Sequence, residues 1–212
     1  LMKKFLLLIV TGFFLTTLQA QYSEKDVLEV KQLVSKNAAV LGLSADDLNN
    51  YVISSTYLST EGIRMIYLYQ SHKGIPVYNQ MHVLAFRDGK PVSIAGGRIK
   101  GFDKMINNPA GLPSITAGEA VLSAIADAKI PASKVAGSVQ NPVTNSLGKL
   151  DFGKLGVAVE DITAELFWFP VSEKEYRLAW QIFLAPDGSS DMWSVKVDAA
   201  TGTVLGKYNY TV

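Results

Sequence analysis

Apolar and polar residues form four strand-like runs between residues 51 and 97. The runs, rich in β-branched and aromatic residues, are residues 51–57, 63–70, 75–86 and 92–97. Between the last two, Asp88 tolerates the left-handed conformation and Gly89 has no Cβ, a combination typical of a hairpin turn. With another turn at residues 72–74, the pattern predicts an antiparallel meander. Pro76 donates no backbone hydrogen bond, so it should open its strand or lie at an edge.

The segment before this meander has the residue spacing of a helix. Apolar residues recur three or four positions apart, at Val27, Val30, Val34, Ala38 and Leu41. They share one stripe, which we expect to cover one face of the meander. Ser23 is the predicted N-cap and Gly42 the predicted end of this helix. Residues 44–47 predict a further short helical turn.

The second half of the chain repeats this plan. Breaker residues at 101–113 predict a connection, and Thr116 with Glu119 forms a capping-box pattern before a helix that stops ahead of Pro131. Residues 131–160 show little periodicity and predict an irregular insertion. The strand pattern then returns in residues 165–169, 176–184, 192–197 and 203–208.

These elements predict an α+β protein made of two cystatin-like units, each a helix packed on an antiparallel meander sheet. The expected boundaries are residues 21–100 for the first unit, 101–115 for the linker and 116–212 for the second unit.

The amino end has the pattern of an export signal. Lys3 and Lys4 precede an apolar run at residues 5–15, and small Ala20 precedes Gln21. This predicts a signal peptide over residues 1–20 with cleavage between Ala20 and Gln21. The apolar run is too short to span a bilayer, which needs about 20 residues. We therefore expect a secreted or periplasmic protein that is not held in the membrane after cleavage.

The composition limits the kinds of partner and catalytic site that the chain can have. The formal net charge is +1 with both signs interspersed, so no nucleic-acid partner is expected. There is no cysteine, and the two histidines, His72 and His82, do not form the His-Glu-x-x-His pattern of a zinc peptidase. The sequence therefore predicts no catalytic, cofactor-binding or metal-binding residues and no enzymatic activity in this segment.

Two groups of residues resemble known propeptide modules. The first group consists of Gly62, Ile63, Tyr67, Gln70, the run Gly74, Ile75, Pro76, Val77, Tyr78 and Asn79, and the turn Asp88, Gly89 and Lys90. It resembles the fungalysin/thermolysin propeptide motif, with the fungalysin family of secreted zinc metallopeptidases as the nearer match. Met65 departs from that motif, which has a histidine there. The second group, residues 194–205 with Asp198 and Gly202, resembles the PepSY domain.

The resemblance implies a secreted pro-region that inhibits a zinc metallopeptidase catalytic domain and helps it to fold. That domain, absent from these 212 residues, would be the partner, linked in cis, and would hold the zinc. The motif positions Tyr67, Gln70, Gly74, Ile75, Pro76, Asn79, Asp198 and Gly202 would be structural or would face the partner. The alternative is a stand-alone periplasmic or extracellular module that binds proteins or inhibits peptidases.

Overall fold

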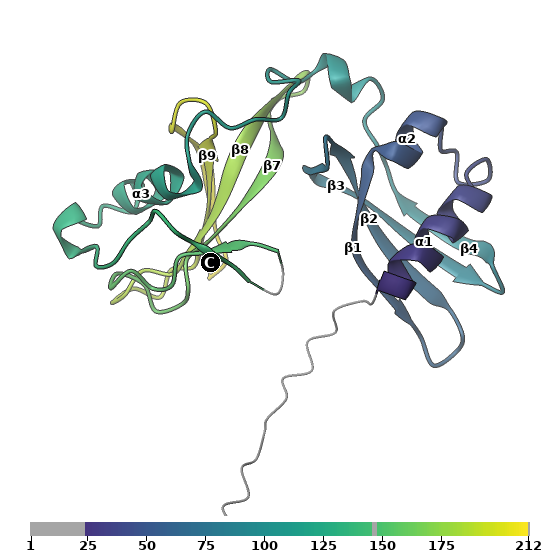
Figure 1. Ribbon diagram of the computed structural model, residues 1–212, viewed down its shortest axis with the longest axis horizontal. Coiled ribbons are helices and arrows are strands. Elements are labelled where there is room, and N and C mark those ends of the chain that lie inside the picture. Colours follow the sequence, from purple (N-terminus) through teal and green to yellow (C-terminus); the bar gives the residue numbers. More distant parts are fainter. Residues whose placement is uncertain (1–23, 146–147, 212) are drawn as a thin grey trace, which may run out of the picture.

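The computed structural model describes residues 24–145 and 148–211, and within them the chain is α+β (Figure 1). The helices are α1 (Glu24–Lys36), α2 (Ala45–Asn49) and α3 (Ala117–Asp127), with 3-10 turns η1 (Phe102–Lys104) and η2 (Ala132–Lys134). The strands are β1 (Tyr51–Leu58), β2 (Arg64–His72), β3 (Ile75–Arg87), β4 (Lys90–Gly96), β5 (Val143–Thr144), β6 (Leu150–Asp151), β7 (Thr163–Ser172), β8 (Glu175–Leu184), β9 (Trp193–Asp198) and β10 (Val204–Asn209). They form one ten-stranded, mostly antiparallel sheet. The α+β prediction is confirmed, while the cystatin-like description of each half stays a prediction.

Strands β1 to β4 form the first meander, in which each strand pairs antiparallel with the next. Its tight turns have positive φ at both central residues, 54° and 75° at Lys73 and Gly74, and 50° and 74° at Asp88 and Gly89. These are type I′ turns, whose twist matches that of the flanking strands. Both predicted hairpins are present.

Helix α1 covers one face of the first meander. Val30 and Val34 pack in the first hydrophobic core, which also contains Ile66, Leu68, Leu84 and Phe86. An ion-pair cluster ties the same helix to β2, because Arg64 lies 3.1 Å from Asp26 and 2.8 Å from Glu29. The predicted packing of helix on sheet is therefore observed here.

The first helix ends at Lys36, earlier than the apolar spacing indicated. Asn37 follows, and its side-chain amide donates to the carbonyl oxygens of Leu33 (2.8 Å) and Gly89 (3.1 Å). Asparagine competes for backbone groups in this way and favours helix ends. Residues 37–42 continue as turns up to Gly42, whose φ is 67°. The predicted cap Ser23 lies outside the described residues.

Strands β7 to β10 form the second meander, covered on one face by α3. The predicted capping box of α3 is present. The Thr116 hydroxyl accepts from the backbone amide of Glu119, and the Glu119 carboxylate accepts from the backbone amide of Thr116. Trp168, Trp180, Ile182 and Leu184 are buried in the second hydrophobic core below this helix.

The two stretches predicted as linker and insertion both pack on the second meander. The backbone amide of Tyr176 donates to the Met105 carbonyl at 2.7 Å, and the amides of Ser114 and Ile115 both donate to the Ala199 carbonyl. In residues 131–145 and 148–160 the only regular elements are η2, β5 and β6, yet this stretch contributes Phe152, Leu155, Val157 and Ala158 to the second core.

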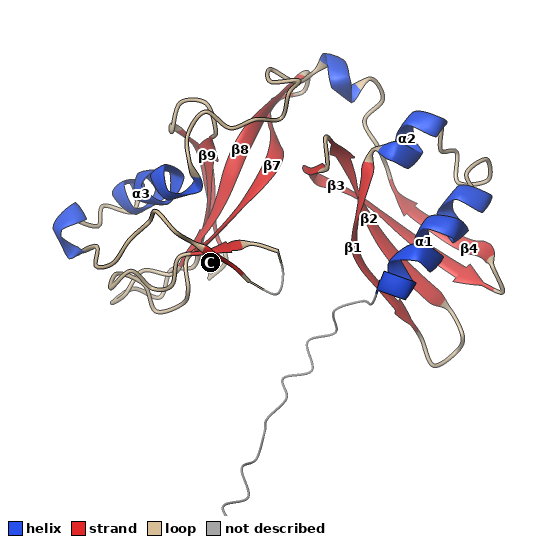
Figure 2. Cartoon of the chain, viewed as in Figure 1, coloured by secondary structure: helices blue, strands red, loops and turns tan. Residues whose placement is uncertain are grey.

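One parallel contact joins the two meanders. Val77, near the start of β3, is the register partner of Trp168 on β7. The helices lie on the outer sides, so the uncovered faces of the two meanders are turned toward each other (Figure 2). Neither the parallel contact nor this arrangement was predicted.

Replacing Gly74 by valine should destabilise the protein by about 1–3 kcal/mol, because a β-branched residue is strained at a φ of 75°. Urea unfolding measures the loss. Gly97→Val is the matched control, since Gly97 also has open space around it but lies outside the left-handed region. Equal unfolding midpoints for the two variants would contradict a role for the Gly74 dihedral.

Candidate functional site

The uncovered side of the first meander carries tyrosine and methionine side chains. Along β2, Ile66 and Leu68 are buried toward α1, so Met65, Tyr67 and Tyr69 project from the opposite side and remain half-buried. We call this side the tyrosine face. By strand register it includes Val52, Ser55, Tyr57, Met65, Tyr67, Tyr69, Met81, Val83, Ala85, Ser93 and Ala95. None of these side chains carries a charge.

A β-bulge in β1 brings Tyr57 onto this face. The register shifts between Ile53, which lies opposite Leu68, and Ser55, which lies opposite Tyr67. One extra residue in a strand moves every following side chain to the other side of the sheet. Tyr57 therefore stacks on Tyr67, with ring centroids 6.3 Å apart, and remains 49% exposed.

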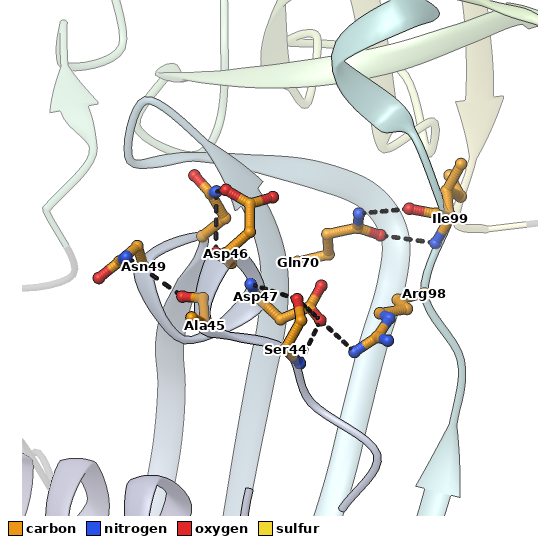
Figure 3. A network of polar contacts seen from close by, with 9 residues as sticks. Ser44, Ala45, Asp46, Asp47, Asn49, Gln70, Arg98 and Ile99 are labelled. Atoms are coloured by element: carbon orange, nitrogen blue, oxygen red, sulfur yellow. Dashed lines mark hydrogen bonds and ion pairs between the residues drawn. The ribbon is translucent and has the colours of Figure 1, made fainter. Parts of the chain in front are cut away.

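Gln70 projects from the other side of β2 and fastens the chain after β4 (Figure 3). Its side-chain amide donates to the Ile99 carbonyl at 2.9 Å and accepts from the Ile99 amide at 2.8 Å. Next to it, Arg98 pairs with Asp47, whose carboxylate also closes the capping box of Ser44. An open cleft of about 780 Å³ with lining side chains of both charge signs lies beside this network.

The motif from Gly74 to Asn79 forms the joint between the meanders. Ile75 packs against the second core, and Pro76 is the second residue of β3, opposite Ser71. Asn79 is exposed and has a φ of 57°, at the irregularity that interrupts pairing between β2 and β3. An asparagine tolerates this left-handed conformation better than most residues.

Aromatic rings surround the joint. The indole of Trp168 donates to the His72 carbonyl at 3.2 Å, and the His72 ring lies 3.1 Å from the Pro109 carbonyl through Nε2. Tyr69 on the tyrosine face makes an edge contact with Phe167, which also contacts Tyr78. The tyrosine face is therefore continuous with the aromatic side chains of the second meander.

Asp198 and Gly202 form a separate turn at the end of β9. The buried Asp198 carboxylate accepts from the amides of Ala200 (2.8 Å) and Thr201 (3.0 Å) and from Arg177 (3.1 Å). Burial opposes ionisation, but these hydrogen bonds and the guanidinium outweigh it and lower the pKa of Asp198. Gly202, with a φ of 76°, donates to the Asp198 carbonyl.

The predicted positions therefore do not converge on one site. Tyr67 faces outward on the tyrosine face, and Gln70 fastens the chain after β4. The joint contains Gly74, Ile75, Pro76 and Asn79, and Asp198 with Gly202 shapes a distant turn. Ala20 and Gln21 lie outside the described residues. Sequence reasoning missed Tyr57 as a member of the face, because the bulge that places it there leaves no local signal. Trp168 was also missed, although a tryptophan in an apolar run is a candidate core anchor.

Within residues 24–145 and 148–211, no three histidine or acidic side chains lie close enough together to hold a metal ion. In the same part of the chain, no helix is long and apolar enough to cross a membrane.

Comparisons with known proteins give distant structural resemblances only. The chain matches no protein-family model and no curated protein sequence. It resembles the Bacillus megaterium YpeB C-terminal domain with a TM-score of 0.36 and 11% identity, over 89% of this chain and 66% of that one. It also resembles a protein described as a lipoprotein from Clostridium difficile 630, with a TM-score of 0.25 and 12% identity, over 82% of this chain and 91% of that one.

Gln70→Leu should destabilise the protein by about 1–3 kcal/mol, because it leaves the Ile99 amide and carbonyl without their side-chain partner. Hydrogen exchange of the Ile99 amide should also become faster. Gln80→Leu is the control, since Gln80 makes no side-chain hydrogen bond to the described residues. Unchanged exchange at Ile99 would contradict the fastening role.

Stability should fall as the pH drops below about 6.5. Burial lowers the pKa of His82, and nearby Arg98 lowers it further, while a hydrogen bond to the Gly97 backbone and the charge of Asp47 oppose the change. Tyr51 and Asp47 line the small cavity at this imidazole with Arg98. The folded state therefore favours the neutral imidazole of His82. The protein keeps its full stability above the pKa that His82 has in the unfolded chain and loses stability as the pH falls below that pKa.

Urea unfolding at pH 7.5 and 5.5 measures this loss. His82→Gln should reduce the difference between the two pH values, whereas His72→Gln should leave most of it. An undiminished difference in His82→Gln would assign the pH dependence to other groups.

Proposed function

We propose that this chain is a non-catalytic pro-region that binds the catalytic domain of a secreted zinc metallopeptidase and keeps it inactive until the pro-region is removed. The tyrosine face carries this proposal. It is a broad, uncharged sheet surface that α1 and α2 leave uncovered, since both lie on the opposite side (Figure 1).

The chemistry of the face suits a protein partner. Tyrosine and methionine are enriched at the centres of protein interfaces, where lysine and glutamate are depleted. Tyr57 and Tyr67 offer stacked rings, each with a polar hydroxyl group. Because a charged surface would lose its hydration here without gaining a counter-charge, the partner should present an uncharged, largely apolar surface.

The edge of the sheet adds a second means of binding. β1 is the first strand in the sheet order, and among the described residues it pairs with β2 alone, so its other edge is available there for an added strand. A peptidase that binds extended substrates has segments suited to such pairing. A strand added beside β1 would place its side chains next to Tyr57.

The resemblance to the fungalysin/thermolysin propeptide and PepSY modules supports the same function. In this protein the residues from Gly74 to Asn79 form the joint, and Asp198 with Gly202 forms a structural turn. These motif positions would keep the tyrosine face in place without touching the partner. The partner, linked in cis, would supply the zinc and the catalytic groups, and the predicted signal peptide would export both.

Residues 22–212, added to a mature fungalysin-type zinc peptidase from the same organism, should inhibit peptide hydrolysis and raise the activity recovered on refolding. The double variant Tyr57→Ser with Tyr67→Ser should inhibit at least tenfold more weakly, because it removes two central aromatic contacts. Titrated inhibition of hydrolysis measures both effects.

Leu122→Ser is the matched control, since Leu122 is an exposed apolar residue on α3, away from the tyrosine face. It should inhibit like the unaltered protein. If the unaltered protein changes neither hydrolysis nor refolding over a wide concentration range, the pro-region proposal is wrong and the stand-alone module replaces it.

A further inference from the structure

A pocket lies on the uncovered face of the second meander. It has a volume of about 470 Å³, and its lining includes Glu165, Gln181 and Ser194 from the adjacent strands β7, β8 and β9. Phe183, Met192 and Tyr210 provide apolar surface at the same pocket. Side chains projecting from paired strands have well-fixed positions, so the pocket is preformed to a large extent.

Behind the pocket lies a buried cation, Lys196, which is only 4% exposed. Its ammonium group donates to the Ser194 hydroxyl at 2.8 Å and to the Ser194 carbonyl at 3.2 Å, and it lies 5.2 Å from the centre of the Tyr78 ring. Among the described residues, no carboxylate lies within ion-pair distance of this group. A buried charge is normally paired, so Lys196 lacks its usual partner.

Ser194 connects this cation to the pocket. Its oxygen accepts the hydrogen bond from Lys196, so its own hydrogen is available to another acceptor. Ser194 lines the pocket but is only 2% exposed, so a ligand must fill the pocket to become that acceptor. The adjacent positive charge polarises the hydroxyl and strengthens its donation to an anion.

The remaining charges are compatible with an anion. Lys149 pairs with Glu165 at 2.6 Å, and Gln181 donates to the same carboxylate oxygen at 3.2 Å. Lys149 and Lys196 against the single Glu165 leave a net charge of +1 around the pocket. The apolar side chains at the other side would contact a hydrophobic group attached to the anion.

We propose that this pocket binds an organic carboxylate attached to an apolar group, with Ser194 as the direct donor and Lys196 as the buried source of positive charge. Such a carboxylate occurs in a free acylated amino acid and at the carboxyl end of a peptide. The site is separate from the tyrosine face and does not depend on the function proposed for that face.

The test uses residues 22–212 and two pairs of probes. The first pair is N-acetylphenylalanine and its amide, and the second is N-acetyl-Ala-Ala-Phe with a free or an amidated carboxyl end. We expect the acids to shift the NMR signals of the Ser194 and Gln181 amides saturably at millimolar concentrations, and the amides to bind at least tenfold more weakly. Binding of the tripeptide acid alone would assign the site to peptide ends, and equal binding of both acids to free acids as well.

Variants separate the two roles. Ser194→Ala should weaken binding of the acids at least tenfold, and Lys196→Met should do the same. Lys196→Arg keeps the charge if the methionine variant does not fold, and should retain binding. Leu122→Ala, distant on α3, is the control and should bind normally. Equal affinity for acids and amides, no binding of either acid, or unchanged binding in Ser194→Ala would overturn the proposal.

Discussion

The arrangement of the two meanders depends on which strands pair with β3. A strand has two edges, and β2 occupies one of them along most of β3. The other edge pairs with β4 from His82 to Arg87 but with β7 at Val77. The change of partner coincides with the irregularity at which Asn79 adopts a φ of 57°. Since a bulge bends and twists a strand, this short segment sets the direction of the second meander relative to the first.

The joint is narrow, so side chains must make it rigid. Val77 and Trp168 are fully buried register partners, and the Trp168 indole also donates to the backbone of β2 at His72. Gln70 holds the chain that leaves β4 through two hydrogen bonds to Ile99. These buried contacts hold the two meanders together more rigidly than a flexible linker would. With the helices on the outer sides, the uncovered sheet faces remain turned toward each other (Figure 2).

Local features of the sequence predicted the elements well. The capping box of Thr116 and Glu119 and the turn residues Asp88 and Gly89 act within a few positions, so their structures follow from neighbouring residues alone. Features that depend on distant partners were missed. The end of α1 depends partly on Gly89, 52 positions from Asn37, and the side chosen by Tyr57 depends on a bulge. Lys196 is buried, and the Tyr78 ring beside its ammonium group comes from the other meander.

The two proposed surfaces differ in chemistry but share a continuous series of contacts. Tyr69 belongs to the tyrosine face and contacts Phe167, Phe167 contacts Tyr78, and the Tyr78 ring lies over Lys196 behind the pocket. Glu165 also lies near enough to Tyr69 to raise the pKa of its hydroxyl, after the larger effect of burial. Contact alone does not couple two sites, because coupling requires an element with two arrangements that both ligands bias. Tyr78 belongs to β3 of the first meander, and its ring contacts Phe167 and Phe169 of the second, so this side chain links the two meanders in one arrangement.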